Sequence, residues 1–187
     1  MFTRLTLVTN LVVLGLFTGV MTGHDSRLSS PSAKTSHSSQ VDQFAGRYIL
    51  VRDQSADLRQ AIDQATETMN FFVRRIARRQ LRQKNVLYPS FVMSRSGEFF
   101  CTALAGESAL SLPLSGSAIT WKAPDGETVR VRLMVGPELG QVFEAKQGRR
   151  ENRFTLSSGG TVLTMEVKII SQELPKPVEY RLVYRRG

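Results

Sequence analysis

Cysteine and histidine are almost absent from this chain of 187 residues, which has one cysteine, Cys101, and two histidines, His24 and His37. One thiol cannot build a disulfide framework or a thiolate zinc cluster. Both histidines lie in a polar N-terminal tract, so Ser-His-Asp or Cys-His catalysis and histidine-rich metal sites are not expected. The chain also lacks a Gly-x-Ser-x-Gly elbow, a phosphate loop and a dinucleotide fingerprint. We therefore expect no enzyme, no cofactor and no metal site.

Acidic residues are also scarce, because 16 Asp and Glu stand against 25 Lys and Arg, which gives a net charge of +9. With 41% hydrophobic residues, the chain can bury the core of one domain. The same composition excludes a collagen, a wholly disordered chain and a polytopic membrane protein. Positive charge favours an anionic partner. Nucleic acid is not expected, because the N-terminus predicts export and the strands lack a basic aromatic platform.

The N-terminal sequence has the pattern of a targeting signal rather than of a folded segment. In residues 1–23, Arg4 precedes an apolar run from Leu5 to Val20, as in a secretory signal peptide. We expect an exported protein, periplasmic or secreted, and the alternative is a membrane anchor formed by the uncleaved signal. Residues 24–42 are rich in serine and poor in apolar residues, which predicts a disordered linker.

The folded domain is expected over residues 43–187, and it begins with a strand at 46–52. A helix over about 54–83 should follow, because apolar residues then recur at helical spacing. No glycine or proline occurs between Gly46 and Pro89, so the pattern favours one long helix unless it breaks around 69–71. The apolar stripe of this helix consists of Leu58, Ile62, Ala65, Met69, Phe72, Val73 and Ile76.

The rest of the chain alternates apolar and polar residues in short runs separated by turn signals. Each strand would have one buried apolar face and one solvent-exposed polar face, as in antiparallel barrels and sandwiches. Short connections favour hairpins throughout. We predict a mainly β domain with one long helix, an up-and-down antiparallel β-barrel of about ten strands. After the strand at 46–52, the predicted strands are 86–95, 98–104, 108–113, 117–123, 127–135, 140–147, 151–157, 160–171 and 177–186.

This order of elements resembles a known family. A strand opened by Phe44-x-Gly46-x-Tyr48, a helical insertion, and hairpin strands that end at Tyr180-Arg-Leu-Val-Tyr184 are similar to the fatty-acid-binding-protein branch of the calycins, which also include the lipocalins. The resemblance covers residues 44–187 and implies a barrel that binds a small hydrophobic ligand. The chain departs from the family in its single long helix, in its signal-like N-terminus, and in Leu182, where fatty-acid-binding members usually have an inward arginine.

A ten-stranded barrel is too wide for side chains alone to fill, so a ligand cavity is expected. Ordinary core packing is the alternative for each inward residue. Because Arg181 and Arg185 should point outward, the interior would offer two tyrosine hydroxyls and no fixed charge, which favours a neutral ligand. An arginine turned inward by a bulge, at position 130, 132 or 153, would reverse this expectation. By strand parity, the ligand-lining candidates are Tyr48, Phe91, Met93, Trp121, Val131, Phe143, Phe154, Met165, Tyr180, Leu182 and Tyr184.

Arginines crowd the second half of the predicted helix, and Phe71 projects among them. Helix-dipole complementarity explains part of this order, and a solvated basic face is the simpler interpretation. The functional interpretation is docking onto an anionic membrane or an acidic protein through Phe71, Arg74, Arg75, Arg78 and Arg79. The leading function is thus a non-enzymatic, exported carrier of a small, neutral hydrophobic ligand. The alternative is an interaction or inhibitor module that uses the arginine-rich helix face.

Overall fold

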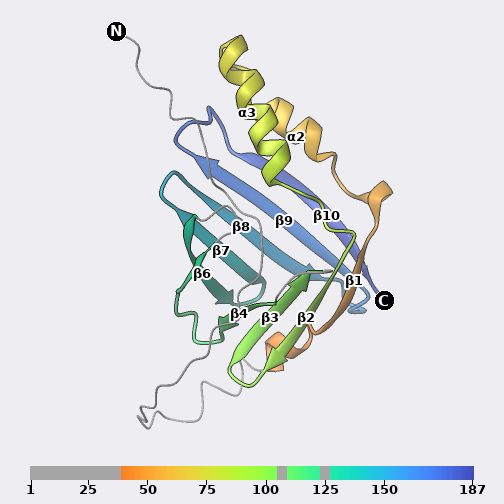
Figure 1. The fold of residues 1–187 in the computed structure, drawn as a ribbon. Helices are drawn as coiled ribbons and strands as arrows, with labels where there is room; N and C mark the ends of the chain where they lie inside the picture. Colours follow the sequence, from red (N-terminus) through yellow and green to blue (C-terminus); the bar gives the residue numbers. More distant parts are fainter. Residues whose placement is uncertain (1–38, 105–108, 123–126) are drawn as a thin grey trace.

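The computed structural model describes residues 39–104, 109–122 and 127–187. The predicted signal peptide and most of the predicted linker lie outside these residues. The described elements form one antiparallel sheet with helices after its first strand (Figure 1). In chain order they are β1 (Gly46–Leu50), η1 (Arg52–Gln54), α2 (Leu58–Ala65), α3 (Phe71–Lys84), β2 (Ser90–Ser96), β3 (Phe99–Leu104), β4 (Leu110–Pro113), β5 (Ile119–Lys122), β6 (Thr128–Val135), β7 (Leu139–Ala145), β8 (Gly148–Leu156), β9 (Val162–Ser171) and β10 (Val178–Arg186).

The sheet is a nearly closed barrel. Its ten strands lie in the order β4-β3-β2-β1-β10-β9-β8-β7-β6-β5, so strands that follow each other in the chain are neighbours except β4 and β5. The first strand, β1, also pairs with the last, β10. That pairing joins the two ends of the domain, with Leu50 opposite Tyr184, while Tyr48 lies opposite Phe91 on β2. In the described residues β4 and β5 form the two edges of the sheet. The predicted ten-stranded up-and-down barrel is therefore confirmed.

Alternation of side chains builds the barrel wall as the sequence predicts. On β10, Tyr180, Leu182 and Tyr184 are buried, whereas Arg181 and Arg185 are exposed. On the outer face, cross-strand charges pair, as in the 2.7 Å contact between Lys168 Nζ and Glu179 Oε1. The core thus lies inside the barrel, and the polar face meets solvent.

The helical insertion consists of two helices, so the prediction of one long helix over about 54–83 is wrong. The alternative, a break around 69–71, is close to the observed interruption between Ala65 and Phe71. The chain turns between them without glycine or proline because side chains cap both ends. Thr66 Oγ1 donates to the Ile62 carbonyl at 2.8 Å at the end of α2, and Asn70 Oδ1 accepts from the Phe72 amide at 3.1 Å at the start of α3. Such side-chain caps satisfy the free backbone groups of helix ends. The insertion is therefore a helix-turn-helix.

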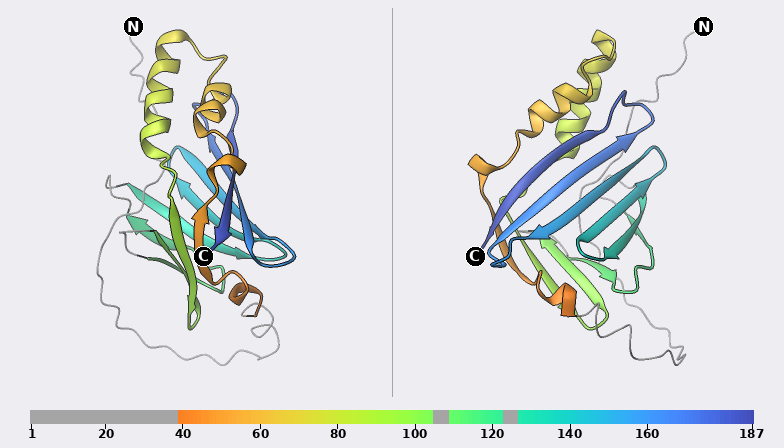
Figure 2. Two further views of the ribbon diagram at one scale, coloured as in Figure 1. Left: turned by 90° about the vertical axis from the view of Figure 1, so that its right-hand side faces the viewer. Right: turned by 180° about the vertical axis from the view of Figure 1, so that it is seen from behind.

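The break also divides the predicted apolar stripe. Its α2 part, Leu58, Ile62 and Ala65, is buried, and α2 packs along β10. In α3 the buried residues are Ala77 and Leu81 instead. Figure 2 shows α3 extending beyond the end of the barrel beside α2. No helix among the described residues is long and apolar enough to span a membrane.

The opposite end of the barrel is covered by the residues just before β1. Residues 39–42 are helical, and Val41 and Phe44 are buried in the core. The carboxylate of Asp42 contacts Arg95 Nε at 2.9 Å, which ties this segment to β2. Residues 39–42, which the sequence assigned to the linker, are therefore helical, and Val41 among them packs in the core.

Candidate functional site

The candidate site is a cavity inside the barrel, beneath the C-terminal end of α3. Its volume of about 70 Å³ exceeds that needed for one water molecule and is small beside the roughly 300–1,000 Å³ of pockets for drug-sized ligands. Side chains therefore fill most of the barrel interior. The lining residues come from the α3–β2 connection and from seven strands: Tyr88, Phe91, Thr102, Leu104, Leu110, Gln141, Phe143, Arg150, Asn152, Phe154, Met165 and Tyr184.

An aromatic cluster forms the apolar part of the wall. The ring of Phe91 lies 4.7 Å from that of Tyr184 in an edge-to-face arrangement, 5.5 Å from Tyr48 and 6.5 Å from Phe154, measured between centroids. Such edge-to-face and tilted contacts stabilise aromatic pairs beyond their burial alone. The cluster fixes the positions of the rings that a ligand would contact.

Arg150 supplies a positive charge to this cavity. It lies on β8, two residues before the buried Asn152, so the strand alternation directs both side chains inward. Arg150 Nε donates to Asn152 Oδ1 at 2.9 Å, and Nη1 donates to Asn85 Oδ1 at 3.2 Å. Within the described part of the chain, no carboxylate forms an ion pair with Arg150. The expectation of an interior without fixed charge is therefore wrong.

A chain of hydrogen bonds continues from Arg150 across the barrel. Asn152 Nδ2 donates to Gln141 Oε1 at 3.4 Å, and Gln141 Nε2 donates to Thr102 Oγ1 at 2.9 Å. Asn152, Gln141 and Thr102 are all buried, at 7%, 3% and 8% exposure. Since unpaired buried polar groups are costly, this network fixes the orientation of the guanidinium.

Tyr184 contributes a hydroxyl that stays protonated. Burial raises the pKa of Tyr184 well above its usual value, the neighbouring Tyr180 adds to this rise, and Arg150 opposes it. The cavity therefore combines one cation, a neutral phenol and amide groups at one end with an apolar wall. This combination can bind the polar head of a small amphipathic molecule and pack against its apolar part.

The eleven predicted lining residues all belong to the core or pack against it, and five of them line the cavity. Those five are Phe91, Phe143, Phe154, Met165 and Tyr184. Tyr48, Met93, Val131, Tyr180 and Leu182 are buried core residues, and Trp121 is partly buried against the core. The hydroxyl of Tyr48 already has a partner in the protein, because it donates to the Phe44 carbonyl at 2.9 Å.

Sequence reasoning missed the polar lining. The predicted strand 151–157 begins one residue after Arg150, whereas β8 begins at Gly148. Extending the same alternation from Phe154 through Asn152 would have placed Arg150 inside. The three arginines considered instead do not line the cavity: Arg130 and Arg153 are exposed and Arg132 is half-buried.

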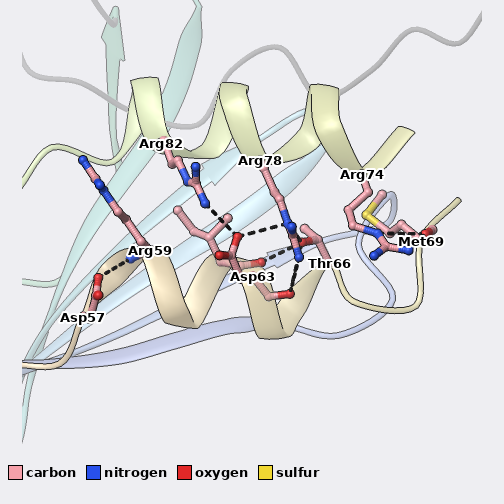
Figure 3. Close-up of polar contacts among 9 residues, drawn as sticks. Asp57, Arg59, Asp63, Thr66, Met69, Arg74, Arg78 and Arg82 are labelled. Atoms are coloured by element: carbon pink, nitrogen blue, oxygen red, sulfur yellow. Dashed lines mark hydrogen bonds and ion pairs between the residues drawn. The ribbon is translucent and has the colours of Figure 1, made fainter. Parts of the chain in front are cut away.

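Three of the helix arginines hold the two helices together (Figure 3). Arg78 Nε and Arg82 Nη2 contact Asp63 Oδ1 at 3.0 and 2.8 Å. Arg74 donates from Nε and Nη2 to the carbonyl of Met69, at 3.1 and 2.8 Å. Of the predicted docking residues, Arg74 and Arg78 therefore serve the α2–α3 turn.

The exposed face of α3 is aromatic as well as basic. Phe71 is 66% exposed, Phe72 is 75% exposed and Ile76 is 45% exposed. Arg75 and Arg79 are exposed too, and their positions at helical spacing put them beside these apolar side chains. Phe72 and Ile76, which the sequence predicted in the buried stripe, thus belong to the outer face with Phe71.

Comparison with known proteins gives structural neighbours only. No protein-family model matches the chain, and no curated protein matches it. Among solved structures, fatty-acid-binding protein 1 of Echinococcus granulosus has 13% identity and a TM-score of 0.48, covering 77% of this chain and 97% of its own. The Schistosoma mansoni fatty acid binding protein in complex with arachidonic acid has 14% identity and a TM-score of 0.47, with coverages of 79% and 98%. The wild-type fluorescent protein UnaG has 12% identity and a TM-score of 0.48, with coverages of 78% and 98%.

The strand order, the closure of β1 on β10 and the helix-turn-helix after β1 decide the fold. The chain folds as a calycin-like β-barrel. Its helical insertion is closer to the pattern of the fatty-acid-binding branch than the sequence indicated, since a turn separates the two helices. In the described ranges, no cluster of three His, Cys, Asp or Glu side chains is placed to hold a metal ion.

Proposed function

We propose that this calycin-like barrel is a non-enzymatic carrier of a small amphipathic ligand whose anionic head binds Arg150. The observation that carries the proposal is a cavity with a largely apolar wall, lined also by a guanidinium that has no carboxylate partner in the described residues. An arginine held by neutral amides is a strong site for a carboxylate, because charge-assisted hydrogen bonds are the stronger ones. The ligand is therefore proposed to be an acid rather than a neutral molecule.

The cavity volume of about 70 Å³ is smaller than an eight-carbon acid, since a cavity of about 150 Å³ is what holds benzene. Octanoate combines a slender chain with the required charge, and its binding requires the side chains around the cavity to move and widen it. The signal-like sequence of residues 1–23 supports a carrier that works outside the cytoplasm, in the periplasm or after secretion.

The test is calorimetric titration with octanoate and with methyl octanoate, which differ in charge and share the alkyl chain. We expect the acid to bind about ten- to hundredfold more tightly, because a hydrogen bond to a charged group contributes about 1.5–3 kcal/mol. The variant Arg150→Met should remove this preference. Arg153→Met is the matched control, because Arg153 lies on the same strand and is exposed. Equal binding of acid and ester by the unmodified protein would refute the proposed head-group site.

A second role, docking onto an anionic membrane, is favoured by the exposed face of α3. Phe71, Phe72 and Ile76 offer apolar side chains for the lipid interface, and Arg75 and Arg79 offer charge for its head groups. This combination suits an amphipathic helix lying on a bilayer surface. An acidic protein partner is the other possible occupant, and it would not require anionic lipid.

Vesicle flotation measures this docking. Vesicles with phosphatidylglycerol should bind the protein, and vesicles of phosphatidylcholine alone should not. Two basic residues contribute about 1 kcal/mol each, so Arg75→Gln with Arg79→Gln should weaken binding roughly thirtyfold. The control Arg47→Gln with Arg130→Gln removes the same charge from exposed positions on the barrel wall. If both double variants lose binding equally, the helix face is not the docking surface.

A further inference from the structure

The helical insertion, α2 and α3, is called the lid, and the residue at its C-terminal end contacts Arg150, the cation of the cavity. Asn85 caps the C-terminus of α3 and is 3% exposed. Its Nδ2 donates to the Leu81 carbonyl at 2.8 Å, and its Oδ1 accepts from Arg150 Nη1 at 3.2 Å. One side chain therefore joins the final turn of the helix to the proposed head-group site.

The helix has few other ties to the barrel. Its main packing partner is α2, where its arginines contact Asp63, and its buried Leu81 belongs to the core cluster. Figure 2 shows its N-terminal half extending away from the strands. Because α3 packs weakly on the sheet, the contact between Asn85 and Arg150 is well placed to hold its C-terminal end over the cavity.

A carboxylate and Asn85 compete for the same guanidinium. Arginine binds carboxylates best through two parallel hydrogen bonds, from Nε and Nη2 or from Nη1 and Nη2. The single N–H of Nε is bound to Asn152, which leaves the pair Nη1 and Nη2, and Nη1 already donates one of its two N–H groups to Asn85. A carboxylate bound to this pair must therefore share Nη1 with Asn85. The Asn85 contact, at 3.2 Å, is the longer of the two and lies at the end of a helix that packs little on the sheet, so it is the one that a ligand would replace.

We propose that Asn85 and Arg150 form a latch, by which a carboxylate ligand in the cavity releases the C-terminal end of α3. This inference rests on the proposed function, since it takes the ligand to be an acid. Coupling between two equilibria is reciprocal. Head-group binding loosens α3, and loosening α3 at Asn85 strengthens head-group binding.

The first experiment tests the latch without ligand. Amide hydrogen exchange of residues 81–85 should become about three- to tenfold faster in Arg150→Met, as expected for the loss of one such hydrogen bond. Exchange should not change in Arg153→Met. In an Asn85→Ala background the same Arg150→Met substitution should add nothing, because the bond is already absent. The latch is refuted if Arg150→Met leaves these amides unchanged, or if its effect persists in full without Asn85.

The second experiment adds octanoate to the unmodified protein. Exchange of residues 81–85 should become faster while exchange in β9 and β10 becomes slower. Asn85→Ala should bind octanoate about three- to tenfold more tightly. The matched control is Asn70→Ala, which removes the cap at the other end of α3 and leaves Arg150 untouched. Slower exchange throughout α3, or equal affinities of the two variants, would overturn the coupling. If octanoate does not bind at all, the proposed function fails, and the ligand-free experiment still decides whether the latch exists.

Discussion

The barrel and its helical lid are stabilised by different means. The barrel wall is a continuous ladder of backbone hydrogen bonds around buried rings such as Phe91 and Tyr184. The lid is two short helices joined by arginine contacts, with Phe71 and Phe72 in solvent. Large apolar side chains are thus placed inside one region and outside the other. The difference indicates that the barrel carries more of the stability than the lid.

The strongest test of this contrast replaces one phenylalanine in each region. Phe91→Ala should destabilise the domain by about 3–5 kcal/mol, because Phe91 contacts three aromatic rings in the core and its loss leaves a cavity. Phe72→Ala, at a 75% exposed site in the lid, should change the free energy of unfolding by less than about 0.5 kcal/mol. Chemical denaturation measures both. Similar losses in the two variants would show that the lid carries as much of the stability as the barrel.

A second test uses alkaline pH. The folded-state pKa of Tyr184 is raised above the usual value of about 10, so the folded state favours the protonated phenol. This contribution is complete below about pH 10 and is lost as the pH rises further, at up to about 1.4 kcal/mol per pH unit. Tyr184→Phe should therefore lose less stability than the unmodified protein between about pH 10 and 11. Parallel pH profiles of the two proteins would contradict the burial of this hydroxyl.

The smallest expected effect on stability concerns the contacts between α2 and α3. Asp63→Asn weakens the contacts with Arg78 and Arg82, which are partly exposed, so global stability should fall by less than about 1 kcal/mol. Hydrogen exchange around residues 66–70 should nevertheless become faster, since these contacts hold the turn. A change of several kcal/mol would mean that the lid and the barrel unfold as one unit.

Sequence patterns predicted the barrel well because alternation reports directly on the two faces of a strand. All ten predicted strands have counterparts, and Tyr180, Leu182 and Tyr184 point inward as expected. The sequence favoured one long helix over a break around 69–71, because Thr66 and Asn70 end and begin helices through side-chain hydrogen bonds, without the glycine or proline that usually marks a turn. The apolar residues continue at helical spacing across this region, so the sequence pattern alone does not reveal the turn.

The polar half of the site was harder to predict than its apolar half. The predicted strand 151–157 left Arg150 outside, so the side-chain alternation was not extended to it, although it lies on β8 and lines the cavity. Arg150 is held inside the barrel by tertiary contacts. Asn85 comes from the end of α3, and Gln141 and Asn152 come from two strands. No local pattern in the sequence brings these amides together.

The central claim is that Arg150 binds the head of an acidic ligand inside the barrel, and the pKa of that ligand tests it most directly. Octanoate labelled with ¹³C at its carboxyl carbon can be titrated by NMR while bound. A nearby guanidinium favours the carboxylate form, so its pKa should lie well below that of free octanoate. In Arg150→Met the bound carboxyl should titrate at or above the free value. A bound carboxyl whose pKa is the same in both proteins would contradict the claim.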